Sequence, residues 1–139
     1  MGLRAYWDSE DKDIIRAEWR GKWTMVDYRR MEQVVRTMIT SVPHRVDGIL
    51  DLHKMLYLPP GYGDTVMESG MEFTANFGIA VLVGSELLWS LTQDYYRHAP
   101  IILARYAYSP TVEGAYPIIR AHRMGSPSPT QIPDGHSLN

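Results

Sequence analysis

Asp51 and His53 are the residues whose types and spacing come closest to a catalytic pair. They stand two positions apart in a stretch expected to be extended, so their side chains point the same way and could share a proton. The alternative is that Asp51 caps the following loop and that His53 is a partly exposed loop residue. Because no nucleophile stands beside the pair in the sequence, this alternative is favoured. We therefore expect no catalytic residue and no enzymatic activity.

Ser85 follows Gly84 at the expected start of a helix, where free backbone N–H groups can bind an anion. One glycine and one serine form no phosphate-binding motif, and Glu86 in the first turn disfavours an anion. Ser85 is therefore better explained as a helix cap. The flanking glycines of a G-x-S-x-G elbow are missing, so a hydrolase is not supported.

The loop over residues 53–62 combines apolar and aromatic side chains with two prolines. This composition suits a partner surface or a ligand lid. The alternative is a loop that folds back and covers the edge of the core. The candidate ligand- or partner-binding residues are Asp51, His53, Tyr57, Tyr62, Ser85 and Glu86.

Composition excludes several classes of partner and chemistry. The 139 residues carry 14 Lys and Arg against 16 Asp and Glu, a net charge of −2, so neither nucleic acid nor an anionic membrane is expected as the main partner. The chain has no cysteine, and its five histidines are scattered, so we expect no metal site and no cofactor. The longest uncharged apolar run, residues 73–85, is too short to span a bilayer. The N-terminus lacks the apolar region of a signal peptide, so a cytoplasmic location is expected.

Alternating helix and strand patterns predict the scaffold for these residues. A β-hairpin is expected over residues 3–21, followed by a helix that starts at Thr24, with Asp27 completing a short capping box, and ends near Ser41. The buried stripe of that helix is expected to be Tyr28, Met31, Val34, Val35, Met38 and Ile39.

The remaining pattern predicts alternating strands and helices. We expect a strand over 46–52, a loop to residue 64, a helix from Asp64 or Thr65 to about 75, a strand over 78–84, a helix from Ser85 to Pro100, a strand over 101–108, and a last helix opened by Ser109 and Pro110 that Pro117 kinks or shortens. We expect residues 1–123 to form one α/β domain and residues 124–139, which are rich in Pro, Ser and Gly, to form a flexible tail. The order β-β-α-β-α-β-α-β-α predicts a mostly parallel mixed sheet with an antiparallel N-terminal edge strand.

The helix after Ser85 is apolar on more than one face. Leu88, Leu91, Thr92 and Tyr95 share the face expected to be buried, whereas Trp89 and Tyr96 share another. Aromatic enrichment is typical of interfaces, so Trp89 and Tyr96 are candidate interface residues for a homodimer or a protein partner. Burial of both faces within the domain is the alternative.

This element order, over residues 3–122, resembles the STAS-like fold of anti-sigma-factor antagonists. The passages that carry the resemblance are Trp19–Thr24, Val46–Leu52, Gly78–Gly84 with Ser85, and Thr111–Ala115. Members that act as phosphoswitches carry a Ser or Thr just after the third strand. Residues 51–57 contain neither, and the nearest downstream is Thr65.

The resemblance implies a regulatory or protein-interaction module without the standard phosphoswitch. The alternative function is a small-molecule-binding domain with a pocket at the carboxyl ends of the parallel strands, between the loop over residues 53–64 and the Gly84–Ser85 turn.

Overall fold

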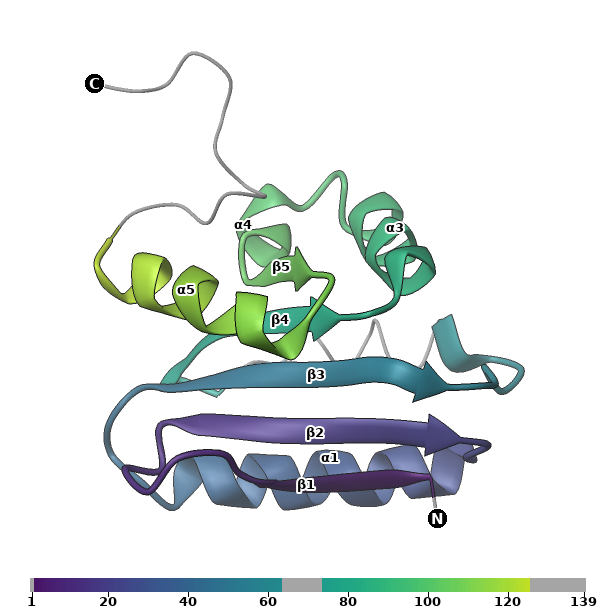
Figure 1. Cartoon of the computed structure of the whole chain (residues 1–139), viewed down its shortest axis with the longest axis horizontal. Helices are drawn as coiled ribbons and strands as arrows, with labels where there is room; N and C mark the ends of the chain where they lie inside the picture. The colour runs from purple at the N-terminus through teal and green to yellow at the C-terminus, as the bar shows by residue number, and fades with distance from the viewer. Residues whose placement is uncertain (1, 64–73, 126–139) are drawn as a thin grey trace.

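A five-stranded mixed sheet runs through the molecule in the order β1-β2-β3-β4-β5 (Figure 1). The computed structural model describes residues 2–63 and 74–125. The strands are β1 (Leu3–Trp7), β2 (Ile14–Gly21), β3 (Val46–Met55), β4 (Phe77–Val83) and β5 (Tyr106–Ser109), and the helices are α1 (Met25–Thr40), α3 (Glu86–Tyr95), α4 (Pro100–Leu103) and α5 (Val112–Arg123). Strands β1 and β2 pair antiparallel, and the other neighbouring pairs are parallel. The predicted α/β class and the antiparallel N-terminal edge strand are confirmed.

Helix α1 begins where its capping signal predicts. The Thr24 hydroxyl accepts from the Asp27 N–H, and the Asp27 carboxylate accepts from the Thr24 N–H, which completes a capping box. Of the predicted stripe, Tyr28, Met31 and Ile39 are buried. Val34 is instead 45% exposed, because the apolar stripe is wider than the surface that the sheet covers.

Helix α3 is capped by Ser85 as predicted, since the Ser85 hydroxyl accepts from the Leu88 N–H. The helix ends at Tyr95 rather than at Pro100. Its predicted buried face was wrong in part, because Leu91 and Tyr95 are exposed. Leu88 and Thr92 are buried together with Tyr96, the C-cap residue that follows the helix.

The predicted strand over residues 101–108 was wrong in its first half. Pro100 occupies the first turn of α4, where its fixed φ suits a helix, and the Ala99 carbonyl accepts from two N–H groups of that turn. Only the segment from Tyr106 pairs with β4.

The last helix also begins later than predicted. Thr111, not Ser109, caps α5, since the Thr111 hydroxyl accepts from the Gly114 N–H. Pro117 does not end the helix, which continues to Arg123. The predicted helix starting at residue 64 or 65 and the predicted tail over 124–139 fall largely on residues 64–73 and 126–139, which lie outside the described residues.

The helices divide the two faces of the sheet unequally. Helix α1 lies behind β1 and β2, and α5 lies in front of β3, β4 and β5 (Figure 1). On the back, Trp19 and Leu82 share a core with Tyr28 of α1 and Leu88 of α3. On the front, the β3 and β4 side chains pack against Ala115, Ile118 and Ile119 of α5. Among the described elements, only α5 packs on the front, so the front of β1, β2 and the carboxyl end of β3 lies open.

No helix in residues 2–63 and 74–125 combines the length and the apolar character needed to cross a membrane.

Candidate functional site

The uncovered front of the hairpin and β3 is polar. We call it the open sheet face and define it by Arg4, Tyr6, Arg16, Glu18, Arg20, Asp51 and His53. It arises from strand alternation, because Ala17 and Trp19 point to the core behind while their neighbours point forward. Because no described helix packs over them, the forward side chains can be charged without the cost of burial beneath a helix.

Two carboxylates form the floor of the open sheet face. Glu18 and Asp51 are opposite each other in the β2–β3 register, and both are buried. Arg4 Nε and Arg20 Nη2 donate to Glu18 Oε1 over 3.0 and 3.1 Å. The Tyr6 hydroxyl donates to Glu18 Oε2 over 2.7 Å. Burial alone would raise the pKa of Glu18, but the Tyr6 hydrogen bond and the Arg4 and Arg20 charges hold it below its ordinary value.

Arg16 separates the two carboxylates. Its Nη2 donates to Asp51 Oδ2 over 3.2 Å, and its Nε lies 3.8 Å from Glu18 Oε2. Burial would lower the pKa of the guanidinium, but the bond to Asp51 and neighbouring negative charges raise it. Arg16 therefore stays charged and reduces the repulsion between the carboxylates.

The structure brings Asp51 and His53 into contact, as their spacing predicts. Asp51 Oδ1 is hydrogen-bonded to His53 Nδ1, which orients the ring. Gly84, which directly follows β4, packs against His53. Its φ is +81°, and a Cβ added to it would lie 2.4 Å from the Cβ of His53. A carboxylate-oriented imidazole can accept or deliver a proton at its other nitrogen.

A bulge in β3 shapes the end of this site. Glu18 is opposite Asp51, but Arg20 is opposite Lys54, so β3 contains one more residue than β2 over this stretch. His53 and Lys54, consecutive in sequence, consequently both line one cavity. That cavity has a volume of about 260 Å³ and is lined by Arg16, Glu18, Trp19, Arg20, Asp51, His53 and Lys54.

The other candidate residues lie elsewhere. Ser85 serves as the α3 cap, and Glu86 and Tyr57 are exposed. Tyr62 is buried, with its ring 5.2 Å from that of Trp23 in an edge-on contact. Burial raises the pKa of Tyr62 far above its ordinary value. Tyr62 therefore covers the core edge, which was the alternative for its loop.

The two candidate interface residues pack inward. Tyr96 is buried and stacks on Tyr106, with ring centroids 5.6 Å apart. Trp89 is half-buried and stacks on Tyr108 at 6.2 Å. The exposed apolar side chains of α3 are instead Leu87, Leu91 and Tyr95, which we call the α3 outer row.

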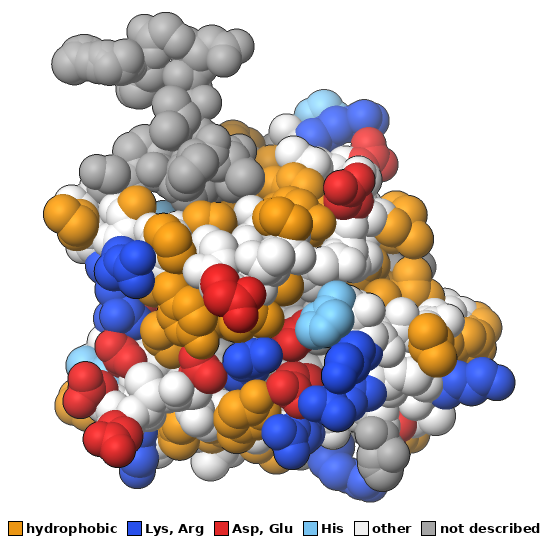
Figure 2. Space-filling view, viewed as in Figure 1, with side chains coloured by type: hydrophobic (Ala, Val, Ile, Leu, Met, Phe, Trp, Pro, Cys, Tyr) orange, Lys and Arg blue, Asp and Glu red, His pale blue; other side chains and the backbone are white. Residues whose placement is uncertain are grey.

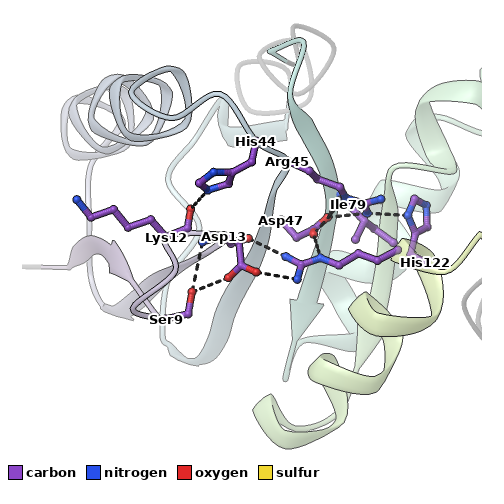
Figure 3. Close-up of polar contacts among 9 residues, drawn as sticks. Ser9, Lys12, Asp13, His44, Arg45, Asp47, Ile79 and His122 are labelled. Carbon is purple, nitrogen blue, oxygen red and sulfur yellow. Dashed lines mark hydrogen bonds and ion pairs between the residues drawn. The ribbon is translucent and has the colours of Figure 1, made fainter.

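A second polar cluster lies at the amino end of β3 (Figure 3). Asp47 at the amino end of β3 is completely buried and accepts from Arg45, from Arg123 over 2.7 Å and from the Ile79 N–H over 2.8 Å. Arg123 also donates to Asp13. We call Asp13, Arg45, Asp47, His122 and Arg123 the Asp47 cluster. It ties the end of α5 to three strands.

Sequence reasoning missed the arginines of both sites. Arg16 and Glu18 lie in the predicted hairpin, yet nothing local indicated that β3 would bring Asp51 beside them. Asp47 and Arg123 are 76 residues apart. Within the described residues, no three His, Cys, Asp or Glu side chains are grouped to hold a metal ion.

Comparison of this chain with protein-family models, with curated proteins and with solved structures finds no match.

Proposed function

We propose that the chain is a non-catalytic regulatory module of STAS-like type that acts in the cytoplasm through protein contacts and self-associates through α3. The STAS-like assignment is supported by the order of elements, an antiparallel hairpin followed by three further parallel strands. Because residues 51–57 contain no Ser or Thr, the module works without the family's phosphorylation switch.

The α3 outer row is the observation that carries this proposal. Leu87, Leu91 and Tyr95 recur every four residues on the solvent side of the helix, and Ile101 of α4 follows at 86% exposure. Figure 2 shows hydrophobic side chains on the surface over α3. Adjoining exposed apolar side chains are typical of a protein–protein contact.

A second copy of this chain is the occupant that the charges of α3 favour. If two copies pack α3 antiparallel about Leu91, Leu87 of one copy meets Tyr95 of the other. The same arrangement places Glu86 at the start of one helix near the Asp94–Arg97 ion pair at the end of the other, where Arg97 can add a second carboxylate partner. Antiparallel helices also bring opposite dipole ends together.

Native mass spectrometry of the variant Leu91→Glu tests the contact. We expect the wild-type protein to give a dimer mass and Leu91→Glu to give a monomer, because the substitution buries a carboxylate at the centre of the row. Val34→Glu is the matched control, since Val34 on α1 is 45% exposed and Leu91 is 42% exposed. That control should remain a dimer. A monomeric wild type, or a dimeric Leu91→Glu variant with native circular dichroism, would contradict the proposal.

The second candidate function is small-molecule binding, and the cavity on the open sheet face favours it. The cavity lies at the carboxyl ends of β2 and β3, where open α/β sheets bind ligands. Its place differs from the expected one, since it is built on the front of the hairpin and β3 and not between the 53–64 loop and the Gly84–Ser85 turn.

A further inference from the structure

We infer that the cavity on the open sheet face is a binding site for a small oxyanion, the phosphate or carboxylate group of a free small molecule. The donors are Arg16, Arg20 and Lys54. This inference rests on the second candidate function and names its ligand class. It is independent of self-association through α3.

The carboxylates of the cavity already have their hydrogen-bond partners. Glu18 accepts from Arg4 and Arg20 at one oxygen and from Tyr6 at the other. Asp51 accepts from Arg16 at one oxygen and is bonded to His53 at the other. A cationic ligand or a metal ion would have to displace these partners, so the floor does not recruit cations.

The cations of the cavity retain unused donors. A guanidinium has five N–H groups, and Arg20 directs one of its nitrogens to Glu18 while its side chain stays largely exposed. Arg16 Nε is buried without a hydrogen-bond partner. Within the described parts of the chain, Lys54 forms no ion pair. The hydrogen-bonding capacity left over in the cavity therefore consists mainly of donors, which an oxyanion can satisfy.

The charge balance of the cavity differs from that of the whole chain. Three cations and two carboxylates line it, with Arg4 beside them, whereas the whole chain has a net charge of −2. Figure 2 shows Lys and Arg side chains gathered with acidic and His side chains on the surface in front of β2 and β3. A locally positive recess on an acidic protein concentrates small anions.

The volume of the cavity suits a small group. The volume of about 260 Å³ lies below the range of roughly 300–1,000 Å³ usual for drug-sized ligands. The β3 bulge aligns Lys54 with Arg20 across the strands, so two flexible cations meet at the mouth. A phosphate or a carboxylate is the group that such a pair can hold from two sides.

Calorimetric titration with inorganic phosphate and with succinate, at constant ionic strength, tests the site. We expect at least one of the two to bind the wild-type protein. The variant Arg20→Gln/Lys54→Gln should bind it more than about tenfold more weakly, because two charge-assisted contacts are lost. Both side chains are exposed, so the variant should keep its fold.

Two controls separate this site from general charge and from the dimer. Arg29→Gln/Arg30→Gln removes the same charge from exposed positions on α1, behind the sheet, and should bind as the wild type does. Leu91→Glu should also bind normally, since the α3 outer row is not part of the cavity. A monomeric Leu91→Glu variant that still binds the anion would show that the two proposals are independent, and a monomeric wild type that binds it would contradict only self-association.

The choice of anion identifies the ligand group. Binding of phosphate alone would assign a phosphoryl group, binding of succinate alone a carboxylate, and binding of both a less selective oxyanion site. The inference is overturned if neither anion binds the wild type. It is equally overturned if the cavity variant binds as well as the wild type, or if the α1 control loses as much affinity as the cavity variant.

Discussion

Asp47 and Asp51 lie four residues apart on the same face of β3, yet their surroundings are opposite. Asp47 is 0% exposed beneath the end of α5, and Arg45, Arg123 and the Ile79 N–H donate to it. Asp51 is 5% exposed but lines a cavity that opens to solvent beyond the reach of α5. One strand therefore carries a carboxylate enclosed by protein donors at its amino end and a carboxylate that lines a cavity at its carboxyl end.

The difference between Asp47 and Asp51 follows from the position of α5, which packs over one end of β3 and not over the other. Where α5 packs, a carboxylate must have its partners within the protein, and Asp47 joins α5 to β3 and β4. Where α5 is absent, water and ligands can reach the arginines, so the same chemistry becomes available for binding. An Arg–carboxylate pair alone does not indicate whether it stabilises the fold or binds a ligand. In this account, the presence or absence of a helix packed over the pair makes that difference.

Asp47→Asn should give the largest loss of stability. It leaves Arg45 without its carboxylate partner and Arg123 with Asp13 alone, and breaking a buried pair costs about 3 kcal/mol or more. Urea unfolding followed by circular dichroism measures the change. A loss below about 1 kcal/mol would mean that the Asp47 cluster is not the structural tie that its geometry indicates.

Gly84→Ala should lower the free energy of unfolding by about 2 kcal/mol, through both its positive φ and the contact with His53. Gly61 is the matched control, because its φ is +79° and nothing lies within 4 Å of its Cβ position. Gly61→Ala should therefore show only the conformational cost of about 1 kcal/mol. Equal losses would show that Gly84 does not pack closely on His53.

Asp51→Asn should cost only about 1 kcal/mol, because Arg16 keeps Asp8 and Glu18 as counter-charges at 3.8 Å and water can solvate the half-exposed His53. Parallel urea unfolding of Asp47→Asn and Asp51→Asn is the sharpest form of the comparison. If both variants lose the same stability, the two ends of β3 do not differ as proposed.

The smallest expected effect is a pH dependence that His122 adds to the Asp47 cluster. Burial first, and then the positive charge of Arg45, lower the pKa of His122 below its ordinary value of 6.5. Between the lowered pKa and 6.5, His122 binds more protons in the unfolded chain than in the folded protein. The free energy of unfolding that this residue contributes is therefore complete above pH 6.5 and is lost as the pH falls below it. Arg45 Nη2 donates to His122 Nδ1, which requires the neutral ring.

Urea midpoints measured between about pH 7.5 and about pH 5.5 check this sign. His122→Gln should lose less stability than the wild type over this interval. A variant with the same or a steeper loss would assign the pH dependence to other groups.

Local signals predicted the parts of the fold that depend on near neighbours. The caps Thr24 and Ser85 and the Asp51–His53 contact follow from spacings of two or three residues. The strand expected from residue 101 was wrong because a short apolar run fits either helix or strand, and only Pro100 indicates a helical turn.

The tertiary parts of both sites have no local signal. Arg16 meets Asp51 across 35 residues, and Arg123 meets Asp47 across 76, through strand register and helix packing. The hydrophobic pattern of α3 also could not predict which side of the helix faces the core, since either of its two apolar faces could have been buried. Packing against Tyr106 and Tyr108 decides it.

Backbone amide chemical shifts recorded during titrations with phosphate and with succinate test the central claim most directly. If one end of β3 is a binding site and the other a structural tie, shift changes will be confined to residues 16–20 and 51–54. Residues 45–47, 79 and 122–123 will stay unchanged. Changes centred on the Asp47 cluster, or spread evenly over the sheet, would contradict the division between the sealed and the open ends of the strand.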